Sequence, residues 1–249
     1  MNPTTHILGI RFFNGDVNEA LAVISRGGGY LVAPSGTCFA RLREDESYRR
    51  AIVDADVAIA DSGLMVTLWR LFKRQNVQRI SGLKYLKHLL AELTRQKNRE
   101  IFWLLPTERA QEKLHDWSRR EAFSISAENC YVAPWYGQQV EDRNLLDRIE
   151  RQRPMHVIIA IGSGAQEKLG YYLRENLSCR PAIHCIGAAL GFITRDQPSI
   201  PNWADAFYLG WLWRLVAQPR RFIPRLMRGF ELPWLIWKYG ERLPPLRNQ

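Results

Sequence analysis

Short apolar segments alternate with segments of helical spacing along most of this chain, and this alternation limits the possible folds more than any other feature. Each apolar segment has the length of a strand, and in the segment after it apolar residues recur every three or four positions. A series of strand–helix units predicts an α/β fold, in which a mostly parallel sheet has helices on both faces. The expected strands are 7–13, 30–33, 57–60, 100–105, 125–132, 156–161 and 182–189. The expected helices are 16–26, 41–54, 64–72, 83–96, 107–120, 141–152 and one that ends at 177.

The length of 249 residues suits one large domain or one domain with an appendage. We place a boundary near 198–203, so that residues 1–200 form a Rossmann-like domain and residues 201–249 form a C-terminal helical appendage. From Trp203 onward the chain holds eight Lys or Arg residues and five of its nine tryptophans. Arginine mixed with tryptophan is typical of a surface at the membrane interface. The alternative is a helical hairpin that packs on the sheet and keeps its arginines in water.

The formal net charge of +10 indicates an anionic partner, but it does not choose among nucleic acid, acidic lipid and a phosphorylated substrate. The sequence has no recognisable nucleic-acid-binding module, and its first strand–helix turn lacks the glycine pattern of nicotinamide-dependent oxidoreductases. No apolar run reaches the roughly 18 residues of a membrane-spanning helix, and the first residues lack the features of a secretory signal. We therefore expect a cytoplasmic protein that does not bind nucleic acid.

No metal site is expected from the sequence. Its four cysteines and five histidines are scattered without the spacing of a zinc site, and we expect reduced thiols. Asp54-Ala55-Asp56 has the DxD form of many metal sites that hold nucleotide diphosphates. Because it precedes the strand at 57–60, we expect it in a solvated loop, at the edge of the sheet opposite to the ligand crevice.

Asp61 is the leading candidate for a catalytic residue. It follows the strand expected at 57–60, and Ser62-Gly63 then leads into the next helix. In an open parallel sheet, ligands bind beyond the carboxyl ends of the strands, so a carboxylate at this point faces the expected crevice. The alternative is that Asp61 or Ser62 only caps the helix that follows, as these residue types commonly do.

Other strand ends bring hydroxyl groups and an arginine to the same edge. Ser35 and Thr37 follow the second expected strand, and Arg79 lies two residues before Ser81, the expected N-cap of the next helix. A helix start beside an arginine suits a phosphate group.

The turn at 162–167, with the sequence Gly-Ser-Gly-Ala-Gln-Glu, follows the most apolar strand. Glycines between a buried strand and a helix let the backbone approach phosphate oxygens, and the helix start contributes its amide dipoles. The turn matches neither GxGxxG nor a P-loop, and a tight turn without a ligand needs the same glycines.

Six segments, taken in order, resemble the WecG/TagA/CpsF glycosyltransferases, which form glycosyltransferase family twenty-six. They are ADVAIADSG, RISGLKYL, IGSGAQEKLG, HCIGAALGF, IPNW and GWLWRLVAQPRR. They extend over nearly the whole chain, and the resemblance rests on their order, since any one alone would be weak. The residues of DSGLM, GAQEKLG and GWLWRL are most similar to those of the branch that transfers glucose or glucuronic acid in exopolysaccharide synthesis.

The resemblance implies an inverting transfer of a sugar from a UDP-linked donor to a saccharide on undecaprenyl diphosphate, by a fold of the GT-E type. It also implies glucose or glucuronic acid as the donor sugar, no cofactor and no metal, and a peripheral position on the inner face of the plasma membrane. The alternatives are N-acetylmannosaminyl transfer by the same mechanism, or a nucleotide-sugar-binding subunit without catalysis. Both a monomer and a homo-oligomer stay open.

The same resemblance gives roles to particular residues. Asp61 would take the proton of the acceptor hydroxyl, which a partly buried carboxylate can do, and arginines and amides would stabilise the departing UDP. The residues implied at the donor are Ser35, Thr37, Arg79, Gly82, Tyr136, Gly162, Ser163, Gln166 and Glu167. Those implied at the acceptor diphosphate are Arg214, Arg221 and Arg225, and those implied at an anionic membrane surface are Trp211, Trp213, Trp234 and Trp237.

The chain also departs from the family pattern. Ala33-Pro34-Ser35 stands where many members have Thr-x-Asn, and Ser62 replaces the glycine after the catalytic aspartate. Ser199 and Gly210 replace an arginine and a glutamate of the C-terminal motifs. The changes at Ser35 and Gly210 bear on which donor sugar is held, because those side chains would face the donor pocket or the junction with the tail.

Overall fold

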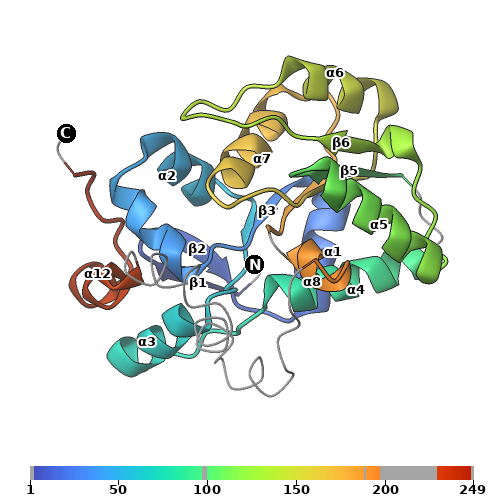
Figure 1. Cartoon of the computed structure of the whole chain (residues 1–249). Coiled ribbons are helices and arrows are strands. Elements are labelled where there is room, and N and C mark those ends of the chain that lie inside the picture. Colours follow the sequence, from blue (N-terminus) through green and yellow to red (C-terminus); the bar gives the residue numbers. More distant parts are fainter. Residues whose placement is uncertain (1–2, 97–99, 188, 197–228, 248–249) are drawn as a thin grey trace.

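The computed structural model describes residues 3–96, 100–187, 189–196 and 229–247. Within these residues, eight strands form one sheet in the order β1-β2-β4-β3-β8-β7-β5-β6 (Figure 1). All neighbouring strands are parallel except β1 and β2, which confirms the prediction of a mostly parallel sheet. The strands are β1 Thr4–Ile7, β2 Ile10–Phe13, β3 Gly29–Val32, β4 Val57–Ala58, β5 Ile101–Leu105, β6 Cys130–Val132, β7 His156–Ile159 and β8 Ala182–Cys185.

Helices cover both faces of the sheet, as the alternating pattern predicts. On one face lie α1 Val17–Gly27, α4 Gly82–Arg95, α5 Glu108–Arg120 and α8 Ala189–Ile193. On the other lie the 3-10 helix η1 Gly36–Arg43, α2 Glu46–Val53, α3 Gly63–Lys73, α6 Arg143–Gln152, α7 Ala165–Asn176 and α12 Glu231–Tyr239. A second 3-10 helix, η2 Ala127–Asn129, leads into β6.

The prediction of one first strand at 7–13 is wrong, because a tight turn at residues 8–9 separates β1 from β2 in a hairpin. Leu8 and Gly9 adopt φ values of +52° and +79° between β1 and β2. Two successive residues with positive φ make the tight turn that reverses a strand. Main-chain hydrogen bonds of 2.8 Å, from Leu8 N to Gly240 O and from Gly9 N to Glu241 O, hold this turn against the C-terminal segment.

Three other predicted boundaries are wrong for local reasons. The helix expected at 41–54 is divided, because the Asp45 side chain accepts the Tyr48 N–H (2.9 Å) and starts a new helix after η1. The strand expected at 125–132 is reduced to β6, since η2 occupies part of its first half. The last strand ends at Cys185, and α8 begins at Ala189.

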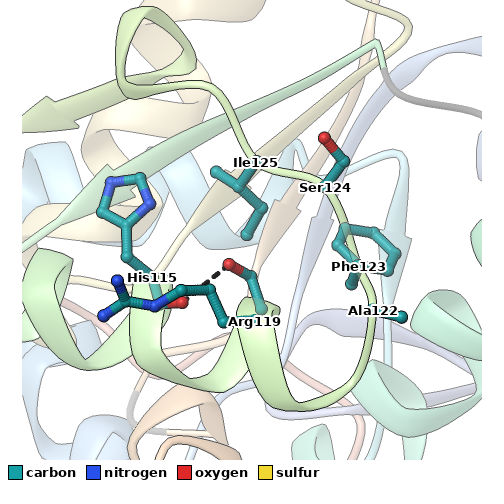
Figure 2. Close-up of a pocket in the computed structure, with 7 residues that line it drawn as sticks. His115, Arg119, Ala122, Phe123, Ser124 and Ile125 are labelled. Carbon is teal, nitrogen blue, oxygen red and sulfur yellow. Dashed lines mark hydrogen bonds between the residues drawn. The ribbon is translucent and has the colours of Figure 1, made fainter.

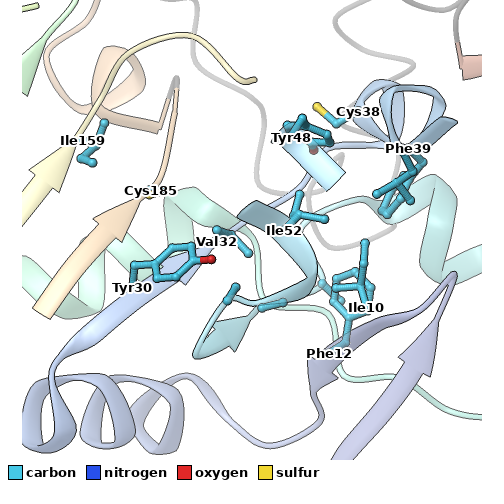
Figure 3. Packing of buried hydrophobic residues seen from close by; sticks show 14 of the residues in the cluster. Ile10, Phe12, Tyr30, Val32, Cys38, Phe39, Tyr48, Ile52, Ile159 and Cys185 are labelled. Atoms are coloured by element: carbon cyan, nitrogen blue, oxygen red, sulfur yellow. The ribbon is translucent and has the colours of Figure 1, made fainter. Parts of the chain in front are cut away.

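The core consists of two clusters, one on each face of the sheet. Figure 3 shows one of them, where Tyr48 and Ile52 of α2 and Phe39 of η1 pack over the sheet. The rings of Phe39 and Phe12 lie 6.4 Å apart between centroids. These aromatic and branched side chains hold η1 and α2 against the sheet, and the Tyr30 hydroxyl of β3 also donates to Ala51 O of α2 at 2.6 Å.

The C-terminal helix α12 belongs to the same cluster. Leu232, Leu235 and Ile236 are buried in it, and α12 packs against η1 and α3. The described part of the tail is therefore attached to the sheet domain by apolar packing as well as by the main-chain bonds to the hairpin. The domain boundary predicted near residue 200 lies outside the described residues and stays a prediction.

A pair of buried histidines crosses the middle of the sheet. His156 of β7 and His184 of β8 stack at 5.4 Å between ring centroids, and His184 Nδ1 lies 2.9 Å from the Tyr85 hydroxyl of α4. Burial lowers the pKa of His156 to about 4, and burial together with the neighbouring His156 lowers the pKa of His184 well below its usual range. Both rings are therefore neutral in the folded protein at neutral pH.

We predict that this pair makes the fold sensitive to mild acid. An unfolded histidine binds a proton below about pH 6.5, whereas the folded pair does not. The free energy of unfolding therefore has its full value above that pH and decreases as the pH falls toward 4. The expected decrease between pH 7 and pH 5 is about 2 kcal/mol per histidine, measured by urea unfolding. His156→Gln should reduce this dependence on pH. His6→Gln, at an exposed position, should leave it unchanged, and an equal pH slope in wild type and His156→Gln would contradict the prediction.

Candidate active site

The carboxyl ends of β4, β3, β8 and β7 lie side by side at one edge of the sheet. Val32 pairs in register with both Ala58 and Cys185, and Ile159 pairs with Cys185, so these four strands end at one level. The segments that leave them contain most of the residues predicted for the site. A ligand over this edge would contact groups from several elements at once.

Asp61 lies just past this edge and is half-buried. Its Oδ1 accepts the Gly82 N–H at 2.8 Å, and its main-chain oxygen accepts Arg79 Nε at 3.1 Å. Ser62 caps α3, since its Oγ accepts the Met65 N–H at 3.2 Å. The capping alternative thus applies to Ser62, whereas the Asp61 side chain reaches across to the start of α4.

Gly82 brings α4 close to the other strand exits. A Cβ at this position would lie 3.6 Å from Ile186 O and 3.9 Å from Ala33 Cβ, which follow β8 and β3. Ser81 caps α4 as predicted, because its Oγ accepts the Lys84 N–H at 3.2 Å. Asp61 and Arg79 therefore lie at the carboxyl edge of the sheet, beside a helix start that also reaches the exits of β3 and β8.

The turn between β7 and α7 is organised around a buried carboxylate. Glu167 is fully buried and accepts three hydrogen bonds, from Gly164 N (2.5 Å), Gln166 Nε2 (3.0 Å) and Ser163 Oγ (3.2 Å). Burial raises the pKa of Glu167, while these donors act in the opposite direction. Glu167 thus fixes the conformation of the turn through buried hydrogen bonds, which suits a residue that positions the turn rather than one that reacts.

Gln166 is almost fully buried in the first turn of α7. Its Oε1 has no hydrogen-bond partner among the described residues, and its amide group lies 3.3 Å from the point where a Cβ of Gly187 would be. The glycine after β8 therefore leaves room beside an unsatisfied acceptor. A buried acceptor of this kind can be satisfied by a ligand N–H or O–H.

Cys38 links the exits of β3 and β7. Its Sγ lies 3.1 Å from Ser35 Oγ and 2.8 Å from Ser163 Oγ. Ser35 and Ser163, predicted separately at the donor, are thus brought together by a thiol that the sequence analysis did not assign to the site. Thr37 lies next to Cys38 in the backbone of η1.

Arg41 is the second residue that the sequence analysis missed. Its Nη1 donates to Ser163 O at 3.0 Å, across 122 residues of sequence. Gly164 has φ +98°, and a Cβ there would lie only 1.5 Å from Arg41 Nη1, so the turn has room for the guanidinium because residue 164 is a glycine. No carboxylate pairs with Arg41 in the described part of the chain. In the amino-acid sequence, only the position of Arg41 shortly after Ser35 indicated that it could lie at the site.

Tyr136 is not brought next to Asp61 by any described contact. Its hydroxyl donates to Asp142 Oδ2 at 2.7 Å, and Tyr131 donates to the same carboxylate, which caps α6. Burial raises the pKa of Tyr131 to about 12, and burial together with Asp142 also raises the pKa of Tyr136. Both phenols therefore stay protonated donors at neutral pH.

The membrane residues fall into two groups. Trp211, Trp213, Arg214, Arg221 and Arg225 lie outside the described residues. Trp234 and Trp237 lie on α12, where they are 39% and 68% exposed.

The DxD segment lies at the opposite edge of the sheet, as expected. Asp56 Oδ2 accepts the Tyr30 N–H at the start of β3 and pairs with Arg180 at 3.3 Å. The expectation of a solvated loop is therefore only partly right: Asp54 is exposed, whereas Asp56 is half-buried and forms an ion pair. Among the described residues no three His, Cys, Asp or Glu side chains gather as a metal would require, and metal independence stays a prediction.

A shallow pocket elsewhere contains none of the predicted site residues (Figure 2). It lies at the C-terminal end of α5, where His115 and Arg119 face Phe123 and Ile125. Because α5 runs back from the carboxyl end of β5, this pocket lies away from Asp61.

Comparison with known proteins shows the family of the chain. Over residues 5–246 the chain matches the model of the glycosyl transferase WecG/TagA/CpsF family. An N-acetylglucosaminyldiphosphoundecaprenol N-acetyl-beta-D-mannosaminyltransferase of Bacillus subtilis (strain 168) is 25% identical over 182 residues, which are 72% of this chain and 68% of the relative. Because the family match extends over nearly the whole length, this chain belongs to the WecG/TagA/CpsF family of glycosyltransferases, enzymes that transfer a sugar.

Proposed function

We propose that this protein transfers a sugar, with inversion, from a UDP-linked donor to a saccharide carried on undecaprenyl diphosphate. The observation that carries the proposal is the Asp61 carboxylate, held by the Gly82 N–H at the carboxyl edge of the sheet in a chain of this family. The relative of B. subtilis acts, by its name, on an undecaprenol-linked diphosphosaccharide, which supports the same class of acceptor here.

The donor sugar that the comparison favours is N-acetylmannosamine. The relative is named an N-acetyl-beta-D-mannosaminyltransferase. Its name gives no support to glucose or glucuronic acid, the donor sugars that the sequence motifs suggested. We therefore propose N-acetylmannosaminyl transfer first and transfer of a hexose or hexuronic acid second. A screen of UDP-sugars against a prenyl-diphosphate saccharide distinguishes the two.

In the proposed reaction Asp61 acts as the general base. As the acceptor oxygen forms its bond to the anomeric carbon, its proton passes to the carboxylate, while the bond from that carbon to the β-phosphate oxygen breaks and UDP keeps the electron pair. The Gly82 N–H holds one carboxylate oxygen, so the base is oriented before the acceptor arrives.

The departing UDP needs positive groups opposite the base. Arg79 is fixed to the main chain of Asp61, and the turn 162–164 lies at the positive dipole end of α7, where Gly164 N and Gln166 N are already bonded to Glu167 and Gly162. Arg41 lies on the same turn, and we propose that it contributes charge to the diphosphate, with Ser163 and Gln166 contacting the rest of the donor. The tail arginines Arg214, Arg221 and Arg225 are proposed at the acceptor diphosphate.

The protein is proposed to work while attached peripherally to the inner face of the plasma membrane, as monomer or homo-oligomer. None of the helices described is both long and apolar enough to cross a bilayer. The exposed Trp234 and Trp237 and the net charge of +10 support contact with an anionic surface. A nucleotide-sugar-binding subunit without catalysis is the rival, and it would not depend on the charge at Asp61.

Asp61→Asn tests the base directly. The amide oxygen of asparagine can still accept the Gly82 N–H, so the fold should be kept while the base is lost. We expect the transfer rate to fall by about 10² to 10⁴ and the affinity for UDP to change by less than about threefold, measured by product formation and calorimetry. Asp54→Asn, an exposed carboxylate at the other edge, should keep full activity. Full activity of Asp61→Asn would refute the assignment of Asp61 as the base, whereas UDP binding without any transfer by the wild type would favour the binding subunit.

Arg41→Ala tests the newly assigned donor residue. Loss of a charged hydrogen-bond donor at a diphosphate should weaken UDP affinity about tenfold. The matched control is Arg50→Ala, which removes the same charge from α2, where Arg50 pairs with the exposed Asp54 at 3.8 Å. Equal UDP affinities of the two variants would show that Arg41 does not contact the donor.

Gly164→Ala and Gly162→Ala form a second matched pair. A side chain at position 164 meets both an unfavourable φ of +98° and the Arg41 guanidinium, so we expect a loss of about 1–3 kcal/mol in the free energy of unfolding. At position 162 a Cβ meets nothing within 4 Å, and the change should stay within about 0.5 kcal/mol. Urea unfolding measures both, and similar values would contradict the packing of Arg41 on this turn.

A further inference from the structure

Helix α12 is apolar on two sides. One stripe, Leu232, Leu235 and Ile236, is buried in the core. A second stripe recurs at helical spacing on the outer side: Phe230 just before the helix, Pro233, Trp234 and Trp237. Phe230 and Trp237 are 66% and 68% exposed. A surface helix normally has one apolar stripe, and a helix that is apolar nearly all round is expected to be covered on both sides.

Helix α3 has the same property. Its core side consists of Met65, Val66 and Trp69, which are fully buried. Leu71 and Phe72, at its C-terminal end, are 68% and 39% exposed. Large exposed apolar side chains on two neighbouring helices are unusual for a surface that faces only water.

The two helices pack against each other, and Figure 1 shows α3 next to α12 at one side of the molecule. Their first residues meet at Gly36, where an added Cβ would lie 2.9 Å from Ser62 Oγ and 3.8 Å from Leu232 Cδ2. At their C-terminal ends, the Nζ atom of Lys73 would lie 3.0 Å from a Cβ added to Gly240, the residue that follows α12. The exposed apolar side chains of α3 therefore belong to the same corner of the molecule as those of α12.

Cations surround this apolar surface. Lys73 and Arg74 follow Phe72 and are exposed, and Lys238 lies 4.8 Å above the Trp234 ring. Arg43 also lies 5.2 Å from the centroid of the Trp234 ring. Exposed aromatic and aliphatic groups within a basic border match the chemistry of an anionic bilayer surface, where the rings enter the interface and the cations meet phosphate.

We propose that the C-terminal end of α3 forms one bilayer-contacting surface together with α12, so that the sheet domain itself touches the membrane. This inference rests on the proposed lipid-linked acceptor and extends the membrane contact beyond the tail tryptophans. The occupant is a bilayer that contains anionic lipid. The surface consists of Leu71, Phe72, Phe230, Trp234 and Trp237 with its basic border.

This arrangement would also bring the catalytic base near the lipid. Helix α3 has 11 residues and is about 16 Å long, and the two residues from Asp61 to its start add at most about 7 Å, so the base lies within about 23 Å of the end that meets lipid. The acceptor saccharide begins at a diphosphate in the headgroup layer. A hydroxyl one or two sugars away from that diphosphate would then lie near Asp61.

The test is vesicle binding of the full chain without substrates, with phosphatidylcholine alone or mixed with phosphatidylglycerol. Leu71→Ser/Phe72→Ser should weaken binding to the mixed vesicles roughly tenfold or more, and Trp237→Ser should do the same. The matched control is Trp135→Ser, which removes a 97% exposed tryptophan from the loop after β6 and should leave binding unchanged. Should the double variant not fold, Leu71→Gln alone is measured instead.

Activity separates this proposal from the proposed reaction. Transfer to a water-soluble short-chain acceptor should stay within about twofold in the α3 variant, while transfer to acceptor in vesicles falls roughly tenfold. Asp61→Asn should show the opposite pattern, with normal vesicle binding and transfer to both acceptors reduced by about 10² to 10⁴. Unchanged vesicle binding of the α3 variant would overturn the proposal. So would a wild-type dimer that the α3 variant converts to a monomer without loss of vesicle binding, because the occupant would then be a second copy.

Discussion

The hydrogen bond from the Gly82 N–H to Asp61 Oδ1 fixes the candidate base to two elements at once. Asp61 follows β4, and Gly82 is the first residue of α4. Gly82 in turn packs near Ala33 and Ile186, at the exits of β3 and β8. The position of the carboxylate therefore depends on the register of the whole sheet and not on a loop of its own. A site supported in this way keeps its geometry while ligands exchange.

The turn before α7 shows how one buried charge accounts for a sequence motif. A buried carboxylate is costly unless its oxygens are hydrogen-bonded, and Glu167 obtains its donors from Gly164, Ser163 and Gln166. Ser163, Gly164, Gln166 and Glu167 are thus explained by the fold before any ligand is considered, whereas the packing does not require a glycine at 162. Among the described residues the fold leaves Gln166 Oε1 without a partner, and Arg41 uses Nη1 for Ser163 O without pairing with a carboxylate. These are the two groups that we propose for contact with the donor.

Apolar periodicity was sufficient to predict the sheet, most helices and the edge at which Asp61 lies, because those features follow from local pattern and the geometry of parallel strands. It failed where a local conformation overrode the pattern, as at the positive φ angles of Leu8 and Gly9 and at the Asp45 cap. Arg41 and Cys38 could not be found this way, since their partner Ser163 is more than a hundred residues away. Contacts of that length exist only once the sheet order is known.

Helix α3 shows the limit of the same reasoning in another way. The spacing of Leu64, Leu68, Leu71 and Phe72 correctly predicts a helix. The fully buried side of that helix, however, is Met65, Val66 and Trp69, and the residues that gave the signal lie on the less buried side. A periodic apolar stripe shows that a helix has a face to cover, but it does not say what covers it. Where two stripes share one helix, the core can take only one, and the other requires a partner outside the fold. For α3 and α12, the basic side chains beside that second stripe are the reason that we propose an anionic bilayer as this partner.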